Sequence, residues 1–133
     1  MTLVKSHMAV TGGIVLLAGV AAAAILPRIA WSSSNGVREI HLVVRDMTYY
    51  ADGQDTPNPT LHVGRGEQVR ILLRNEDAGM SHDFAIRAWS RGTGVIDGRG
   101  DAAVEFTAPD SPGVETYACT PHGEMMRGTI RVE

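Results

Sequence analysis

The sequence predicts an all-β domain, a Greek-key β-sandwich or barrel of about 100 residues that follows an N-terminal transmembrane or signal helix. Three observations lead to this expectation. Short runs of alternating apolar and polar residues recur between turn residues after residue 36. Glycine and proline account for 15 and 6 of the 133 residues, which suits a loop-rich β protein better than a helical bundle. No amphipathic helical pattern of useful length occurs in the same region.

Seven or eight segments have the pattern of short strands, and glycine or proline residues separate them. They cover residues 37–45, 47–51, 60–63, 68–75, 83–88, 102–107, 114–119 and 128–133. The pattern is strongest at 68–75, where Val69, Ile71 and Leu73 would share one face of the strand. The glycine-rich stretch at 91–100 is not a phosphate-binding loop, because no Gly-Lys-Ser/Thr ends it and no helix pattern comes after it.

The first thirty residues differ in composition from the rest of the chain. Residues 8–27 carry no charge, and as a helix they would reach about 30 Å, the thickness of the hydrocarbon core of a bilayer. Lys5 precedes this run, which predicts that the C-terminal part of the chain is exported. We expect residues 1–30 to be a signal anchor, or a signal peptide cleaved near Ala22–Ala24. Residues 31–36 then form a linker, and residues 37–133 form the domain.

Charge and cysteine content exclude several classes of protein. Without Lys5 and Arg28, the twelve basic residues fall to ten arginines against fifteen acidic residues, a net charge of −5. This balance disfavours nucleic acid as a partner and suits a basic partner surface. A single cysteine excludes an intrachain disulfide and a four-cysteine zinc site. The expected location is the periplasm or another extracytoplasmic membrane face, with anchoring by the N-terminal helix, or secretion after cleavage.

One cluster of residues in the sequence has the side chains of a metal-binding site. Cys119, His122, Met125 and Met126 fall within eight residues, on the predicted loop between the last two strands. Thiolate, imidazole and thioether are soft donors, so the oxygen-preferring ions calcium and magnesium are excluded. Zinc accepts cysteine and histidine but has little use for methionine, whereas copper accepts all three. The blue-copper arrangement combines these donors with a second histidine.

His82 is the candidate for that second histidine. It comes after the strongest strand, at a turn, and it can meet Cys119 and His122 if both loops lie at the same end of the sandwich. His41 and His62 lie within strand patterns, and we interpret both as surface or structural residues. Cys119 as a small buried hydrophobe is the alternative that needs no metal.

These segments resemble the cupredoxins, the type 1 blue-copper family, and most of all amicyanin and plastocyanin. Residues 119–122 and 126–133 are similar to the C-terminal copper loop of the family. Residues 58–60, 64–75 and 81–84 match its middle portion more loosely. The resemblance implies that His82, Cys119 and His122 are the equatorial ligands of one copper ion.

The resemblance also bears on the axial ligand. Amicyanins usually have two residues between the second histidine and the methionine, and plastocyanins have four; here Met125 gives two and Met126 gives three. The methionine-x-glycine ending of the family matches Met126 and Gly128, which favours Met126. Met80, close to His82, is expected to serve packing or the rim of the site.

The implied function is transfer of single electrons between redox proteins by a membrane-tethered or exported monomer that is not an enzyme. A filled set of four ligands leaves no open position for a substrate. The contacts with electron donor and acceptor are expected to be transient. The alternative is a carrier that delivers copper without shuttling electrons.

Overall fold

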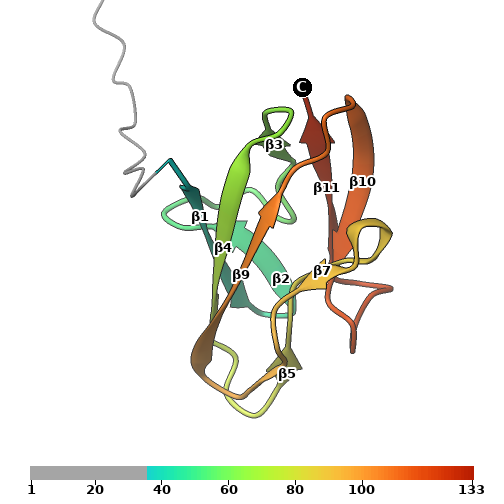
Figure 1. Cartoon of the computed structure of the whole chain (residues 1–133). Coiled ribbons are helices and arrows are strands. Elements are labelled where there is room, and N and C mark those ends of the chain that lie inside the picture. Colours follow the sequence, from blue (N-terminus) through green and yellow to red (C-terminus); the bar gives the residue numbers. More distant parts are fainter. Residues whose placement is uncertain (1–35) are drawn as a thin grey trace, which may run out of the picture.

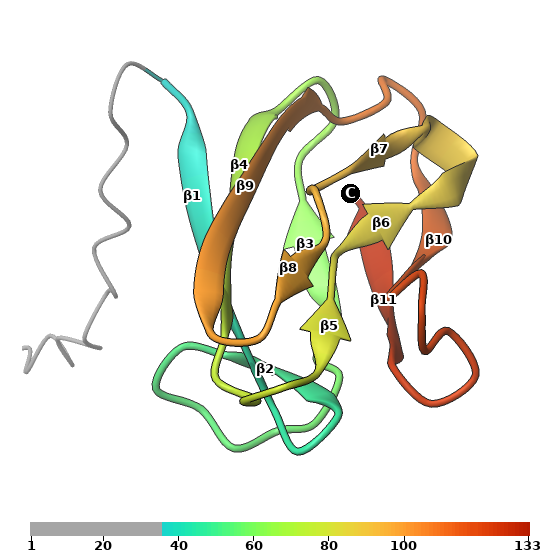
Figure 2. The ribbon, with the colours of Figure 1, turned by 90° about the horizontal axis from the view of Figure 1, so that it is seen from below.

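Residues 36–133 form two β-sheets that face each other in the computed structural model of the chain (Figures 1 and 2). The predicted signal segment, residues 1–30, lies outside the described residues, as does all of the predicted linker except Gly36. In the part of the chain that is described, no helix combines the length and the apolar character needed to span a bilayer. The all-β sandwich expected from the strand patterns is confirmed.

The first sheet has the strand order β2-β1-β4-β9. Its strands are β1 (Arg38–Arg45), β2 (Thr48–Ala51), β4 (Gln68–Asn75) and β9 (Gly100–Thr107). β1 runs parallel to β4, while the β1–β2 and β4–β9 pairs are antiparallel. The predicted alternation of β4 is confirmed, because Val69, Ile71 and Leu73 are all buried. One face of this sheet therefore supplies a large part of the core.

The second sheet has the strand order β3-β11-β10-β6-β7. Its strands are β3 (Leu61–Val63), β6 (Ala85–Ile86), β7 (Arg91–Gly92), β10 (Gly113–Ala118) and β11 (Arg127–Val132). A separate two-stranded pair joins β5 (Ser81–His82) to β8 (Ile96–Asp97). The loop between β10 and β11 and the segment that carries β5 emerge at the same end of the sandwich, the lower end in Figure 1.

Three aromatic residues occupy the core close to that end. Tyr49, Phe84 and Tyr117 are fully buried, and the Phe84 and Tyr117 rings stack with their centroids 5.1 Å apart. The Tyr49 ring meets the Tyr117 ring edge-on at 5.3 Å. Each phenol has an acceptor, since Tyr49 donates to the carbonyl of Asp83 and Tyr117 donates to that of Pro59. Burial raises the pKa of both phenols, so both remain hydrogen-bond donors.

The single strand predicted over residues 83–88 is wrong in its bounds. The structure has only β6 and the start of a 3-10 helix (Arg87–Trp89) there, β5 ends just before this segment, and the adjoining glycine-rich stretch contains β7 and β8. The chain doubles back, because the amide of Thr93 donates to the carbonyl of Phe84 over 2.8 Å. A Cβ at Gly92 would lie 2.9 Å from that same carbonyl oxygen, so the fold-back requires glycine. Phe84 and Ile86 are both buried, as the alternation predicted.

An ion pair ties the start of β1 to the turn before β4. Arg38 Nε lies 2.6 Å from a carboxylate oxygen of Glu67, whose other oxygen accepts the amide of Gly64 over 2.6 Å. Burial alone would raise the pKa of Glu67, but the bonds from Arg38 and Gly64 outweigh it and hold the pKa below its usual value. The ionised carboxylate therefore stabilises the fold.

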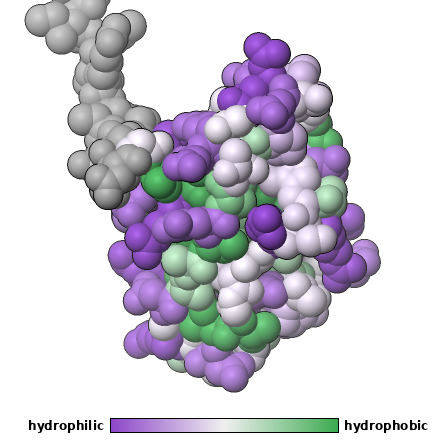
Figure 3. All heavy atoms as spheres, viewed as in Figure 1, coloured by the Kyte–Doolittle hydropathy of each residue, from purple (hydrophilic) through white to green (hydrophobic). Residues whose placement is uncertain are grey.

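Hydrophilic, intermediate and hydrophobic side chains share the face seen in Figure 3, and the hydrophobic areas are separate patches among the others. Scattered apolar residues of this kind are normal on protein surfaces. Across β1, β4 and β9, the outward side chains include ion pairs of Arg70 with Glu39 and Glu105. The exterior of the first sheet is therefore polar, in keeping with one buried and one solvated face.

Candidate metal centre

Three metal-ligating side chains converge at one end of the sandwich. His82 comes from β5, while Cys119 and His122 come from the loop after β10. Their donor atoms all lie within 4.8 Å of one another. Cys119 Sγ lies 3.7 Å from Nδ1 of each histidine. Within residues 36–133, this is the one group of three or more histidine, cysteine or acidic side chains placed to hold a metal ion.

Backbone hydrogen bonds shape the loop that carries two of these residues. The amide of His122 donates to the carbonyl of Cys119, and the amides of Met125 and Met126 both donate to the carbonyl of His122. The amide of Cys119 donates to the carbonyl of Met126 over 3.0 Å, which closes the loop. Met126 is fully buried as a result, whereas Met125 is 63% exposed.

A buried carboxylate joins the two segments that supply the donors. Asp83 is 5% exposed, and its Oδ1 accepts the amide of Thr120 over 2.6 Å. Asp83 comes directly after His82, and Thr120 comes directly after Cys119. This single bond therefore holds His82 and Cys119 in register, although they lie 37 residues apart in the chain.

The electrostatics favour a neutral imidazole at His82. Burial lowers the pKa of His82, although the neighbouring carboxylate of Asp77 acts in the opposite direction. Burial alone would raise the pKa of Asp77, but hydrogen bonds from the amides of Met47 and Asp46 and from His82 hold it below its usual value. His82 Nε2 lies 3.1 Å from Asp77 Oδ2, and Nδ1 of the same ring lies 3.7 Å from Cys119 Sγ.

The cysteine environment also suits a metal ion. Cys119 is fully buried, and burial raises the pKa of its thiol. Deprotonation of such a sulfur needs a compensating cation, and two imidazole nitrogens lie beside it to share that cation. With the buried thioether of Met126 on the same loop, these residues form the donor set typical of a type 1 copper site. Copper is the cofactor that they fit.

The residues named from sequence fall into two groups in the structure. His82, Cys119 and His122 are brought together, as the argument from the two loops required. His41 and His62 are exposed and lie in β1 and β3, where His62 Nδ1 pairs with Glu133 at 2.8 Å. Both are therefore surface residues, as predicted.

Two residues beside the site were missed by the sequence analysis. Asp77 contacts His82 through a side-chain oxygen, and Asp83 contacts Thr120 in the same way. Their closeness to the ligand histidine in the chain was the one available signal, since acidic residues in turns are usually solvated. Met80, expected at the rim or in packing, is 38% exposed.

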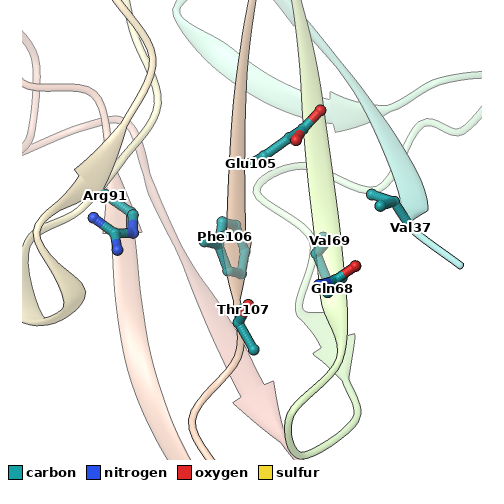
Figure 4. A pocket seen from close by; sticks show the side chains of 7 residues that line it. All are labelled: Val37, Gln68, Val69, Arg91, Glu105, Phe106 and Thr107. Atoms are coloured by element: carbon teal, nitrogen blue, oxygen red, sulfur yellow. The ribbon is translucent and has the colours of Figure 1, made fainter. Parts of the chain in front are cut away.

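A cavity of about 310 Å³ lies away from this cluster, between the first sheet and β7 (Figure 4). Arg91 stands on one side of it, and Phe106 and Val69 stand on the other. Its remaining lining residues are Val37, Gln68, Glu105 and Thr107. None of these residues belongs to the His82, Cys119 and His122 cluster, so the cavity is not part of the candidate site.

The fold is that of the cupredoxins, as comparison with solved structures shows. Auracyanin A, a "blue" copper protein from Chloroflexus aurantiacus, is 19% identical with a TM-score of 0.60 over 74% of this chain and 100% of its own. Rusticyanin from Thiobacillus ferrooxidans is 22% identical with a TM-score of 0.53 over 75% of this chain and 79% of its own. Auracyanin B is 16% identical with a TM-score of 0.58 over 77% of this chain and 92% of its own.

No protein-family model matches the chain, and no curated protein sequence matches it. The particular likeness to amicyanin and plastocyanin stays a prediction from sequence.

Proposed function

We propose that this protein is a type 1 copper protein that carries single electrons between redox partners outside the cytoplasm. One observation carries the proposal. His82 from β5 and Cys119 and His122 from the loop after β10 place their donor atoms within 4.8 Å of one another, and the same loop buries Met126 where it returns to β11. Copper in such a site supplies one-electron exchange between its Cu(II) and Cu(I) states.

The chain is built to keep this donor set in one arrangement. Cys119 and His82 are fully buried, and the Asp83–Thr120 bond ties together the segments that carry them. A site whose ligands are already in place reorganises little when an electron arrives or leaves. Fast electron transfer with little rearrangement is the expected consequence.

Electrons are proposed to enter and leave the copper site through the His122 ring. It is only partly buried, whereas His82 is sealed in the core, so a partner can approach the site through the His122 ring. Pro121 beside it is exposed, and Gly123 on its other side is partly exposed. Small contact patches of this kind suit redox partners that must dissociate quickly.

The proposed location rests on the N-terminal sequence. The uncharged run at residues 8–27 behind Lys5 supports an anchor that leaves the copper domain on the extracytoplasmic face, or a signal peptide that releases it. The net charge of −5 that remains after residue 30 supports partners with basic surfaces. Within the family, the similarity of residues 119–122 and 126–133 to the C-terminal copper loop supports a relation to amicyanin and plastocyanin.

A second candidate function is copper delivery without electron transfer. Two exposed methionines favour it, since Met125 is 63% exposed and Met80 is 38% exposed. Thioethers are ligands for Cu(I), and exposed ones could pass the ion to an acceptor. The buried position of Cys119 and His82 argues against it, because a carrier must release its cargo easily.

Voltammetry of the copper-loaded full-length protein separates the two functions. An electron carrier is expected to give a reversible one-electron wave and to keep its copper when mixed with a Cu(I) chelator. A delivery protein would give no reversible wave and would lose its copper rapidly to the chelator. Cys119→Ser is the control, because it removes the thiolate and should abolish the wave.

A further inference from the structure

Asp77 makes three hydrogen bonds that join the candidate site to a distant turn. Its Oδ1 accepts the amide of Asp46 over 2.7 Å, and its Oδ2 accepts the amide of Met47 over 3.0 Å. The same Oδ2 lies 3.1 Å from His82 Nε2. Asp77 lies on the segment between β4 and β5, which passes beside the β1–β2 turn (Figure 2).

The turn that Asp77 caps is strained. Asp46 and Met47 are the two central residues between β1 and β2, with φ of 50° and 58°. Both are in the left-handed region, which a two-residue hairpin turn requires and which asparagine and glycine adopt most readily. A methionine there persists only where the surroundings hold it, and the Asp77 carboxylate holds both amides.

The segment that carries Asp77 is itself fixed. Asn75 is 1% exposed, and its Nδ2 donates to the carbonyls of Met80 and Gly98 over 2.9 and 2.6 Å. Asn75 Oδ1 accepts the amide of Asp77 over 3.0 Å. The carboxylate is therefore held from both sides, and its position relative to His82 does not depend on a flexible loop.

We propose that Asp77 is a positioning residue that fixes His82 in the tautomer protonated on Nε2, directs Nδ1 into the metal site, and favours the oxidised state of the bound metal. The inference rests on the proposed copper function for its redox part. A carboxylate bonded to the outer nitrogen of a ligand imidazole makes that imidazole a stronger donor. Cu(II) carries one more positive charge than Cu(I), so it gains more from that donor and from the nearby negative charge.

The redox part is tested by the reduction potential of Asp77→Asn in the copper-loaded full-length protein. The amide keeps one oxygen that can accept a hydrogen bond but loses the charge. Loss of such a partner typically weakens metal binding tenfold to a hundredfold. If the loss falls on Cu(II), the potential rises by about 60 to 120 mV, since tenfold corresponds to about 59 mV for one electron.

Glu76→Gln is the matched control. Glu76 is the neighbouring acid on the same segment, its side chain is 46% exposed, and its carboxylate lies near Arg74 rather than the site. It loses the same charge without touching His82. A clear rise for Asp77→Asn with little change for Glu76→Gln supports the proposal. Equal shifts in the two variants, or no shift in Asp77→Asn, would overturn it.

The positioning part is tested without copper, by nitrogen-15 NMR of the His82 ring in the metal-free protein. The wild type is expected to show the proton on Nε2, and Asp77→Ala is expected to show a mixture of tautomers. A proton on Nδ1 in the wild type contradicts the proposal. If the wild type fails to form a blue copper site, the proposed function fails, and this measurement alone decides the inference about Asp77.

Asp77→Ala also removes the cap of the strained turn and can unfold the protein for that reason. Met47→Gly relieves the left-handed residue and restores the turn without Asp77. In the Met47→Gly background, Asp77→Ala is expected to fold and still to show the mixed His82 tautomer. A single Nε2-protonated form in that double variant would refute a role for Asp77.

Discussion

Gly128 offers a quantitative test of the packing behind the site. It lies directly opposite Tyr117 in the β10–β11 pair. A Cβ at this position would come within 2.2 Å of the Tyr117 hydroxyl oxygen and 2.3 Å of the adjacent ring carbon. The ring cannot yield easily, because it is fully buried, stacks on Phe84 and donates to the carbonyl of Pro59 over 2.6 Å.

The cost of Gly128→Ala can be worked from these contacts. Overpacking a core costs about 1–3 kcal/mol, and displacing the Tyr117 hydroxyl forfeits a hydrogen bond worth about 0.5–1.5 kcal/mol. We expect the free energy of unfolding to fall by about 2–4 kcal/mol, measured by urea denaturation of the metal-free protein. The denaturation midpoint should fall while the slope stays unchanged.

Two variants make this prediction specific. Gly113→Ala is the control, since Gly113 pairs in the same two strands and nothing lies within 4 Å of its added Cβ. It should cost less than about 0.5 kcal/mol. In a Tyr117→Leu background the added methyl has room, so Gly128→Ala should cost less than about 1 kcal/mol. A cost as small as that of Gly113→Ala in the wild-type background would show that the reasoning is wrong.

Three further predictions concern the site and the fold. Met126→Leu should shift the reduction potential and the visible spectrum, because it replaces the buried thioether at nearly constant volume, while Met125→Leu at the exposed neighbour should shift neither; equal effects would exclude Met126 as axial ligand. Copper at about a thousand times its dissociation constant should raise the free energy of unfolding by about 4 kcal/mol. Cys119→Ser should lose most of that gain in a thermal melt, and retention of the full gain would place the copper elsewhere. Glu67→Gln should cost about 1–2 kcal/mol at neutral pH, because the pKa of Glu67 is held down by its bonds, from Arg38 above all others. That cost should shrink as the pH falls below the unfolded carboxyl pKa of about 4.3 and vanish below the folded one, so a cost independent of pH would refute it.

The sequence alone was enough to predict the sheets where burial imposes a period of two. Val69, Ile71 and Leu73 alternate because one face of β4 packs on the core, and that pattern is legible without a structure. The prediction of one strand over residues 83–88 was wrong because the chain folds back after Phe84. That fold-back depends on Gly92 approaching the Phe84 carbonyl, a backbone contact that the alternation of apolar residues does not indicate.

The same distinction applies to the site. Cys119 and His122 are three residues apart, so their chemistry was visible in the sequence. The roles of the Asp77 and Asp83 carboxylates were not visible in the sequence, because they depend on partners far away in the chain. Asp83 meets Thr120 across 37 residues, and Asp77 meets Asp46 across 31 residues. Polar side chains in turns carry no periodicity that would mark such partners.

The most direct measurement is a titration of the metal-free full-length protein with Cu(II), monitored by visible absorption. Three donors that converge on one point should bind a single equivalent and produce an intense blue thiolate-to-copper band. That band should be absent in Cys119→Ser. A colourless complex in the wild type, or a blue band that survives Cys119→Ser, would contradict the assignment of His82, Cys119 and His122 to one copper ion.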